Sequence, residues 1–180
     1  MTVPHPAAVQ RFILQWGNMG SAWGVNRSVS QIHALLYLSE KPMSAEDIAL
    51  RLDMARSNVS GSIKELLAWG LIRRAPVMGD RRDFFEAETD LWEVARLIAA
   101  GRKTREIDPA VAALKACMSE AEDDPAVHPV ARQRLQAMLE FTQSVDRWHL
   151  QMLEVPKAKL ALLIRLGAKI IKYLPLGKAK

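Results

Sequence analysis

The chain has little cysteine and no long apolar run, and both absences exclude classes of protein. Cys117 is the single cysteine among 180 residues, so no disulfide can form within the chain and a reducing, cytoplasmic setting is expected. No apolar run approaches the length of a membrane span. The first residues also lack the charged start and apolar core of a secretory signal, which again predicts a cytoplasmic location.

Residue groupings that would indicate an enzyme or a metal site are also missing. The four histidines, His5, His33, His128 and His149, show no ligand spacing with one another or with Cys117. The sequence contains no catalytic constellation, phosphate-binding loop or nucleotide fingerprint. We therefore predict a protein that is not an enzyme and that uses neither a cofactor nor a metal.

Acidic residues are absent from both ends of the chain. The formal net charge is +5 and the sequence pI is about 9.6. Residues 1–27 carry two basic groups and residues 155–180 carry seven, with no acidic group in either segment. Residues 28–90 and 91–154 each carry eight basic and ten acidic groups. A nucleic-acid partner for the middle of the chain must therefore be argued from local placement and not from pI.

Helical periodicity begins near the N-terminus. The apolar residues at helical spacing are Val9, Phe12, Ile13 and Trp16. Their spacing predicts an amphipathic helix from residue 6 to about residue 16. Three glycines between residues 16 and 24 are expected to break or loosen it. A second helix is predicted from an N-cap at Ser28 to about residue 40.

Two short helices with a tight connection follow. Ser44 and Asp47 resemble a capping box at the start of the first helix, and a turn is expected at Asp53 and Met54. The second helix is predicted from about Ala55 to Trp69, and Gly70 would end it as a C′ glycine. Paired helices of this kind are typical of a helix-turn-helix.

The periodicity then changes to that of a β-hairpin, with strands at about 71–77 and 83–88 and a tip near residues 78–82. A helix-turn-helix followed directly by a hairpin predicts a winged helix. The fold class expected is therefore mainly α with a small β-hairpin wing, in which N- and C-terminal helices serve dimerisation.

The C-terminal half is predicted to be helical. A helix starts at Leu91, a new one restarts at Asp108 and Pro109, and a long helix follows the loop at 122–129 until Pro156 ends it. A basic amphipathic helix is expected from Lys157 to about Leu174. We predict an N-terminal dimerisation helix (1–27), a winged helix-turn-helix (28–90) and a helical dimerisation and effector region (91–180). The apolar stripes at 9–16 and 135–153 lack obvious partners, so they are expected to bury each other in a homodimer.

The second helix of the pair presents small polar and basic residues that suit the major groove of double-stranded DNA. These predicted DNA contacts are Arg56, Ser57, Asn58, Ser60, Ser62 and Lys64. Arg56 and Asn58 are the candidates for base contacts and Lys64 for phosphate. A merely solvated face is the alternative, but three serines and a glycine are poor helix formers, which favours a binding role.

The hairpin tip carries Arg81 and Arg82 between Asp80 and Asp83. An arginine gains strongly in the negative potential of a narrow minor groove, provided that it is held extended. Asp80 can hold Arg82 through a bidentate pair, so Arg82 is the favoured inserted residue. The reverse, with Arg81 inserted and Arg82 on phosphate, stays open. Arg74 on the preceding strand completes the predicted wing contacts.

The runs "LDMARSNVSGSIKELLAWGLI" and "GDRRDFFEAET" resemble the MarR family of winged-helix transcription regulators. The family's Asp-x-Arg wing motif matches Asp80 to Arg82, and its closing threonine matches Thr89. With "REIDPA" at 105–110, the resemblance extends to the GbsR branch. It implies a homodimeric, ligand-relieved repressor of osmoprotectant or related genes and a choline- or betaine-like effector. Ala55 departs from the capping Ser or Thr frequent in the family, at a cost of roughly 1 kcal/mol to the helix.

Quaternary ammonium ligands bind in aromatic cages, for which tryptophan offers the best face. Trp16, Trp23, Trp92 and Trp148 are the candidates for an effector cage, and the alternative is that they fill the core, as we expect of Trp69. Cys117 is interpreted as a small buried apolar residue or, alternatively, as a redox switch.

Two further functions remain open. A winged helix can serve as a protein-interaction module, although its polar and basic recognition face argues against that. The basic tail could lie on an anionic membrane, but packing on the dimer is favoured, so a membrane partner is not expected.

Overall fold

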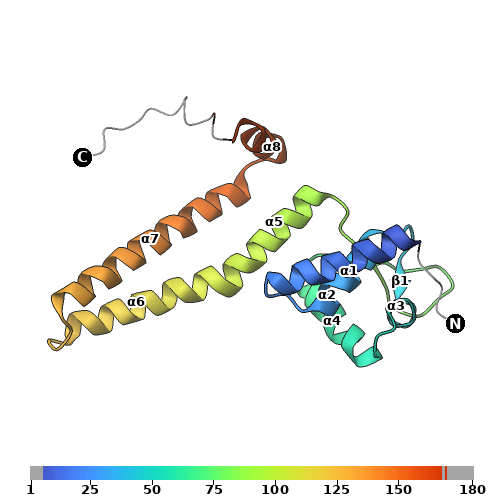
Figure 1. Cartoon of the computed structure of the whole chain (residues 1–180), viewed down its shortest axis with the longest axis horizontal. Coiled ribbons are helices and arrows are strands. Elements are labelled where there is room, and N and C mark those ends of the chain that lie inside the picture. The colour runs from blue at the N-terminus through green and yellow to red at the C-terminus, as the bar shows by residue number, and fades with distance from the viewer. Residues whose placement is uncertain (1–5, 168, 170–180) are drawn as a thin grey trace. The chain divides into compact units, whose positions relative to one another are not determined.

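The computed structural model describes residues 6–167 and 169, and the chain divides into two compact units, Met1–Ile98 and Ala99–Lys180 (Figure 1). The first unit holds α1 (Ala7–Ala22), α2 (Arg27–Tyr37), β1 (Met43–Ser44), α3 (Ala45–Leu52), α4 (Arg56–Ala68), β2 (Ile72–Arg74), β3 (Phe84–Ala87) and most of α5 (Leu91–Arg102). The second unit holds the rest of α5, η1 (Lys103–Ile107), α6 (Asp108–Asp123), α7 (Pro129–Glu154) and α8 (Lys157–Leu166). This mainly helical fold with a small antiparallel sheet confirms the predicted class.

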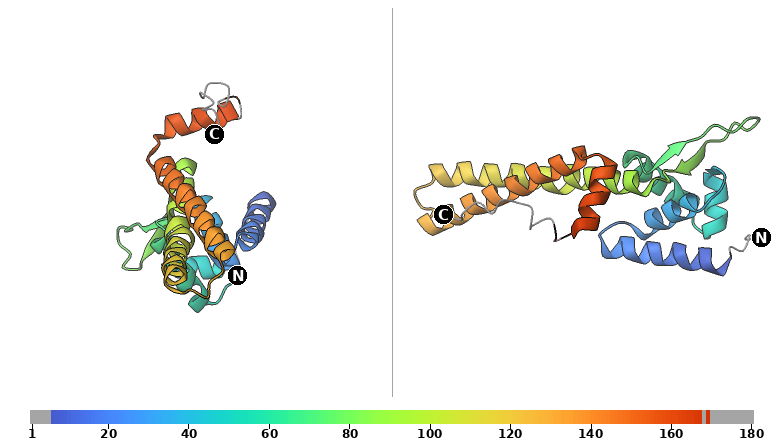
Figure 2. Two further views of the ribbon diagram at one scale, coloured as in Figure 1. Left: turned by 90° about the vertical axis from the view of Figure 1, so that its left-hand side faces the viewer. Right: turned by 90° about the horizontal axis from the view of Figure 1, so that it is seen from above.

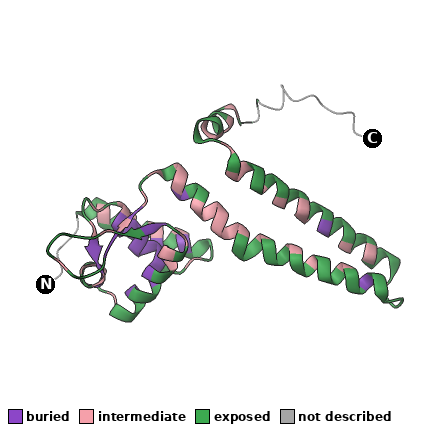
Figure 3. Cartoon of the chain, turned by 180° about the vertical axis from the view of Figure 1, so that it is seen from behind, coloured by how far each residue is buried: buried purple, intermediate pink, exposed green. Residues whose placement is uncertain are grey.

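Helix α2 is the centre of the first unit. Ile32 is fully buried and Leu35 is 2% exposed, and α2 packs against α1, α4 and β3. Most of the buried residues of the described chain gather here, as Figure 3 shows. Because burying one large aliphatic side chain is worth about 1.5–3 kcal/mol, this core dominates the stability of the unit.

Helix α1 runs through the glycines that were expected to break it. Gly17 and Gly20 are buried in the helix, where they face α2. A Cβ atom added at Gly20 would stand 1.9 Å from Ser30 Oγ, and one added at Gly17 would stand 2.6 Å from Gln31 Cγ. The glycines therefore let the two helices approach closely. The stripe of Val9, Phe12, Ile13 and Trp16 finds its partner in the core of the same chain, and not only across subunits as predicted.

Helix α2 begins two residues earlier than predicted, and its N-cap is Asn26. Asn26 Oδ1 accepts from the backbone N–H of Ser28 at 2.8 Å, so Ser28 is not the cap. Helix α2 ends at Tyr37. The capping box of α3 is confirmed, because Ser44 Oγ accepts from the Asp47 N–H and the Asp47 carboxylate accepts from the Ser44 N–H.

The sheet has three antiparallel strands in the order β1-β3-β2. Ser44 is paired with Phe84, and Arg73 with Glu86. The strands β2 and β3 are shorter than predicted, and β1 is a strand that the sequence did not indicate. The long connection between β2 and β3 extends beyond the sheet, as the right-hand view of Figure 2 shows in green.

Helical structure continues without a break from α5, which ends at Arg102, to α6, which begins at Asp108. Helix α6 begins at Asp108 with Pro109 at its start, as predicted, but the predicted cap at Asp108 is wrong, because the N-cap is Ile107 and the π-helical segment η1 joins α5 to α6 without a break. Proline lacks the N–H that an α-helix needs at this position, and its ring crowds the preceding turn. The wider π turn accommodates both, since the Asp108 N–H donates to the Lys103 carbonyl, five residues back.

Helices α6 and α7 form an antiparallel pair (Figures 1 and 2). Ala121 of α6 and Leu139 of α7 are buried residues of this pair. The predicted apolar stripe of α7 divides into two: part of it faces α6, and Met138 and Val145 are exposed. Helix α8 ends at Leu166, and the predicted extension to Leu174 lies outside the described residues.

A matched pair of glycine substitutions tests the α1–α2 contact. We expect Gly20→Ala to destabilise the protein by about 1–3 kcal/mol, because the new methyl group overlaps Ser30. Gly61→Ala should stabilise it by about 0.5–1 kcal/mol, because Gly61 lies within α4 with open space around its Cβ position. Urea denaturation measures both, and equal effects would contradict the close approach.

His33 makes stability depend on pH. It is 4% exposed between Trp16 and Tyr37, its Nε2 has no hydrogen-bond partner in the described chain, and burial lowers its pKa to about 4. The folded state thus binds this proton more weakly than the unfolded state, so stability is lost as pH falls from about 6.5 towards 4. We expect a total loss of about 3 kcal/mol from this group, and His33→Phe should remove it. Denaturant titrations from pH 7 to 4.5 measure the difference, and parallel curves would contradict it.

Candidate nucleic-acid interface

Helix α4 presents most of the predicted polar face to solvent. Its exposed residues include Arg56, Ser57, Asn58, Ser60 and Lys64. Ser62 is the exception, since it is 4% exposed and belongs to the inward stripe with Val59, Ile63 and Leu66. The prediction of Ser62 as a DNA contact is therefore wrong, because its position in the helical repeat places it inside. Ala55 precedes the helix without a side-chain cap, as expected.

Asn58 links the start of α4 to the start of α2. Its Nδ2 donates to Ser28 Oγ at 2.9 Å, across 30 residues of sequence. The N-terminal turns of the two helices therefore lie side by side, and the positive ends of both dipoles meet there. Ser28 is a residue of this surface that sequence reasoning missed, since it was interpreted only as a cap.

The wing tip is a tight turn. The Asp80 N–H donates to the Val77 carbonyl at 3.2 Å, and Gly79 has a φ of 82°, which favours glycine. Met78 at this turn is fully exposed. Nearer the sheet, Nε of Arg74 at the end of β2 lies 3.8 Å from Oδ1 of Asp83, which precedes β3. Both side chains are about two-thirds exposed, so this ion pair adds little stability.

Asp80 and Arg82 form the predicted bidentate pair. Arg82 Nη2 donates to Asp80 Oδ2 at 2.6 Å, its Nε donates to Oδ1 at 3.1 Å, and its backbone N–H donates to Oδ1 at 3.0 Å. The side-chain bond, followed by the backbone bond, lowers the pKa of Asp80 below its ordinary value. The same side-chain bond raises the pKa of Arg82. The pair therefore remains ionised at neutral pH.

The Arg82 guanidinium is turned towards the sheet. Its Nη1 lies 3.3 Å from Ser44 Oγ, and its Cζ lies 5.1 Å from the centroid of the Phe84 ring. Ser44 is fully buried and also caps α3, so Arg82 ties the wing to the helix-turn-helix. Arg81, by contrast, is exposed and has no hydrogen bond or ion pair within the described chain. Sequence reasoning missed this role of Ser44.

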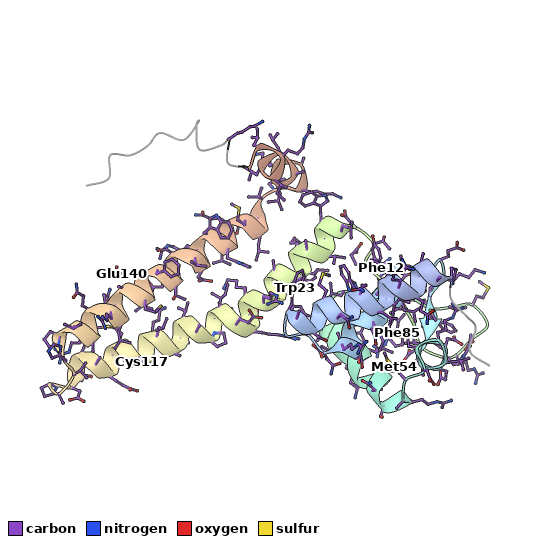
Figure 4. All side chains as sticks on the ribbon, viewed as in Figure 1. Phe12, Trp23, Met54, Phe85, Cys117 and Glu140 are labelled. Carbon is purple, nitrogen blue, oxygen red and sulfur yellow. The ribbon has the colours of Figure 1, made fainter. Side chains whose placement is uncertain are left out.

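The predicted tryptophan cage is not assembled around Trp16. The ring contacts of Trp16 are with Phe12 and His33, at centroid distances of 5.5 Å and 6.2 Å. Trp23, which Figure 4 labels beside the end of α1, is 60% exposed. Trp148 is 58% exposed and Trp92 is half-buried. Trp69 packs against the core, as predicted. A ligand role for these tryptophans stays a prediction.

Cys117, possible metal ligands and possible membrane spans were the remaining features considered in the sequence. Cys117 lies exposed on α6, so the interpretation as a buried apolar residue is wrong. Within residues 6–167 and 169, no group of three or more potential ligands could hold a metal ion. In the same part of the chain, no helix is both long and apolar enough to cross a membrane.

Comparisons with known proteins agree with this geometry. Residues 23–83 match the model of the MarR family. A curated Bacillus subtilis protein, "Putative HTH-type transcriptional regulator YvaV", is 23% identical over 86 residues, which cover 48% of this chain. The aligned region spans about half (49%) of the length of that relative.

Two solved structures were also compared. The crystal structure of a transcriptional regulator matches with a TM-score of 0.64 and 20% identity, covering 81% of this chain and 95% of that chain, which shows a shared fold. A mutant of S. aureus MepR covers 77% of this chain and 89% of its own at 16% identity, but its TM-score of 0.37 is too low to carry an argument. The family model thus matches residues 23–83 of this chain, and the shared fold extends over most of it.

Proposed function

We propose that the protein is a transcription regulator that binds double-stranded DNA as a homodimer at a pseudo-palindromic operator. The observation that carries this proposal is the exposed polar face of α4, from Arg56 to Lys64, beside a wing in which Asp80 holds Arg82 and leaves Arg81 exposed. A helix with small polar residues can enter the major groove, while a hairpin reaches the adjacent minor groove. The family match supports a regulator and not an enzyme.

The contacts of Arg81 and Arg82 indicate different roles for these two arginines of the wing. Arg82 is engaged by Asp80, Ser44 and Phe84, so moving it into a groove would break several contacts at once. Arg81 is exposed and has no such contacts to lose. We therefore assign the groove contact to Arg81 and the bracing of the wing to Arg82, which reverses the sequence-based preference.

The N-terminal turns of α2 and α4 supply a second kind of contact. Ser28 and Asn58 are joined there by a hydrogen bond, and backbone N–H groups at both helix starts favour a phosphate. Arg56 lies on the same exposed turn of α4. This surface would fix the register of the protein on the duplex while the rest of α4 contacts bases.

An exposed stripe on α7 supports the homodimer. Met138, Phe141, Val145 and Trp148 are spaced by three and four residues, and they are between 37% and 67% exposed. This spacing is that of a coiled-coil seam, and a second copy of the same stripe matches it in a two-fold dimer. A dimer would place two copies of α4 on two half-sites.

The resemblance to the GbsR branch extends the proposal to repression that a choline- or betaine-like ligand relieves, in the cytoplasm. No described contact selects this ligand, so a thermal-shift series with choline and betaine is the direct test. A protein-interaction module remains the alternative function. It would be favoured if the protein bound no duplex more strongly than random DNA.

Separate substitutions of Arg81 and Arg82 test whether Arg81 contacts the groove and Arg82 braces the wing. In gel shifts with the DNA upstream of its own operon, Arg81→Ala should weaken binding about tenfold and reduce its salt dependence by about one ion. Arg82→Ala should also weaken binding, but additionally it should lower the protection of the wing amides from hydrogen exchange in the absence of DNA. If Arg81→Ala bound normally, the assignment of the groove contact would be wrong.

A charge in the α7 stripe tests the dimer. We expect Phe141→Glu to shift the protein towards monomer in analytical ultracentrifugation and to abolish operator binding, because a carboxylate would be desolvated in the seam. Gln133→Glu adds the same charge on an exposed face of α7 outside the stripe and should leave the dimer intact. Equal sedimentation of Phe141→Glu and the parent protein would contradict this seam.

A further inference from the structure

The tip of the wing carries apolar side chains that the fold does not use. Pro76, Val77 and Met78 are consecutive and exposed, and the Met78 side chain is fully exposed. None of the three belongs to the hydrophobic core or to the partly buried residues that pack against it. Single apolar residues are common on protein surfaces, but a run of exposed ones promotes unwanted association unless it serves binding. The tip therefore needs a functional explanation.

The turn at the tip holds Met78 at its outer corner. Residues 77–80 form a four-residue turn, which is closed by the hydrogen bond from the Asp80 N–H to the Val77 carbonyl. Gly79 has a φ of 82°, and among the described residues Asp53 is the one non-glycine residue with a positive φ. Met78 therefore has a negative φ, and the turn is of type II, in which only the third residue needs a positive φ. At the second position of this turn, the Met78 side chain extends into solvent.

The turn is fixed to the body of the winged helix. Asp80, its last residue, accepts hydrogen bonds from the backbone N–H and the guanidinium of Arg82. Arg82 Nη1 in turn lies 3.3 Å from the buried Ser44 Oγ. A side chain that is presented on a preorganised turn loses less conformational freedom on binding than one on a loose loop. Met78 is thus presented by the fold, although it contributes nothing to the core.

A cation stands beside this apolar tip. Arg81 directly follows the turn and is exposed. Proteins that bind the minor groove of DNA combine the same two elements. Their arginines are attracted by the negative potential of the groove, and an apolar side chain such as methionine or proline wedges between base steps. An apolar pocket on a partner protein would instead have to desolvate the charge of Arg81, which is costly without a paired anion.

We propose that Met78 is an apolar wedge that enters the minor groove beside Arg81 and partly unstacks a base step, so that the bound duplex is kinked. The inference rests on the proposed function and adds to it a contact that carries no charge. Wedges of this kind bend DNA by roughly 20–90°. Because pyrimidine–purine steps kink most easily, Met78 would favour an operator with such a step under each wing. It would thus contribute to sequence preference without a hydrogen bond to any base.

Substitutions of Met78 test this proposal. Met78→Gln keeps the length of the side chain and removes its apolar character, whereas Met78→Leu keeps that character and is the matched control. Because the side chain is fully exposed, neither change should move the midpoint of urea denaturation. Met78→Gln should weaken binding to the DNA upstream of its own operon about tenfold, since burying a methionine contributes about as much as one decade of affinity. Met78→Leu should bind within about twofold of the parent protein.

Salt dependence separates this contact from that of Arg81. The slope of affinity against salt concentration follows the number of phosphate charges that the protein neutralises. Met78→Gln removes no cation, so it should keep the slope of the parent protein. Arg81→Ala, by contrast, should reduce it.

The bend of the bound duplex measures the wedge itself. Circular-permutation gel shifts give both the size and the position of the bend. We expect the parent protein and Met78→Leu to bend the duplex equally, and Met78→Gln to lose most of the bend. Replacing the bent step by a stiff A-tract should cost the parent protein about tenfold in affinity and should cost Met78→Gln much less.

The proposal is overturned if Met78→Gln bends the duplex as the parent protein does, and equally if the parent protein leaves the duplex straight. In both cases the proposed function stands, provided that the parent protein prefers its operator to random DNA. If it shows no such preference, the proposed function fails and the wedge fails with it. A Met78→Gln variant that binds and bends normally but self-associates less in analytical ultracentrifugation would instead assign the tip to a contact between copies of the chain.

Discussion

The hydroxyl group of Ser44 is the point at which the helix-turn-helix, the sheet and the wing are joined. It accepts from the Asp47 N–H, donates to the Asp47 carboxylate and accepts from Arg82, all with the residue fully buried. The same residue pairs with Phe84 in the sheet. This one residue therefore takes part in the start of α3, in the edge strand of the sheet and in the base of the wing. Because the wing is long and carries few other anchors, its direction relative to the helix-turn-helix follows from this junction.

Much of the first unit could be predicted from the sequence because its signals are local. The capping box at Ser44, the C′ glycine at Gly70 and the stripe through Val59 and Leu66 each act within a few residues, and each was found. The pairing of Asp80 with Arg82 was predictable for the same reason. The contact between Arg82 and Ser44 spans 38 residues of sequence, so no local pattern reveals it.

The predictions that failed concern residues whose role in this structure differs from the most frequent role of their residue type. Glycine within a helix usually weakens it, but Gly17 and Gly20 lie within α1 and permit close packing on Gln31 and Ser30. Asp108 and Pro109 were expected to restart the chain after a break, whereas α6 follows the π-helical segment η1 directly. Ser62 was grouped with its polar neighbours although the helical period places it inside. Each error arose because tertiary contacts outweigh local propensity.

Helix α4 has an unusual relation to the core beneath it. It lacks a side-chain cap and contains Gly61 and several serines, so its own propensity for helix is low and its four buried residues hold it in shape. Any loosening of the core, by heat or by mutation, would therefore fray the first turn of α4 before the unit unfolds as a whole. The temperature range over which α4 keeps the shape that the proposed DNA contact needs would then be narrower than the range over which the protein remains folded.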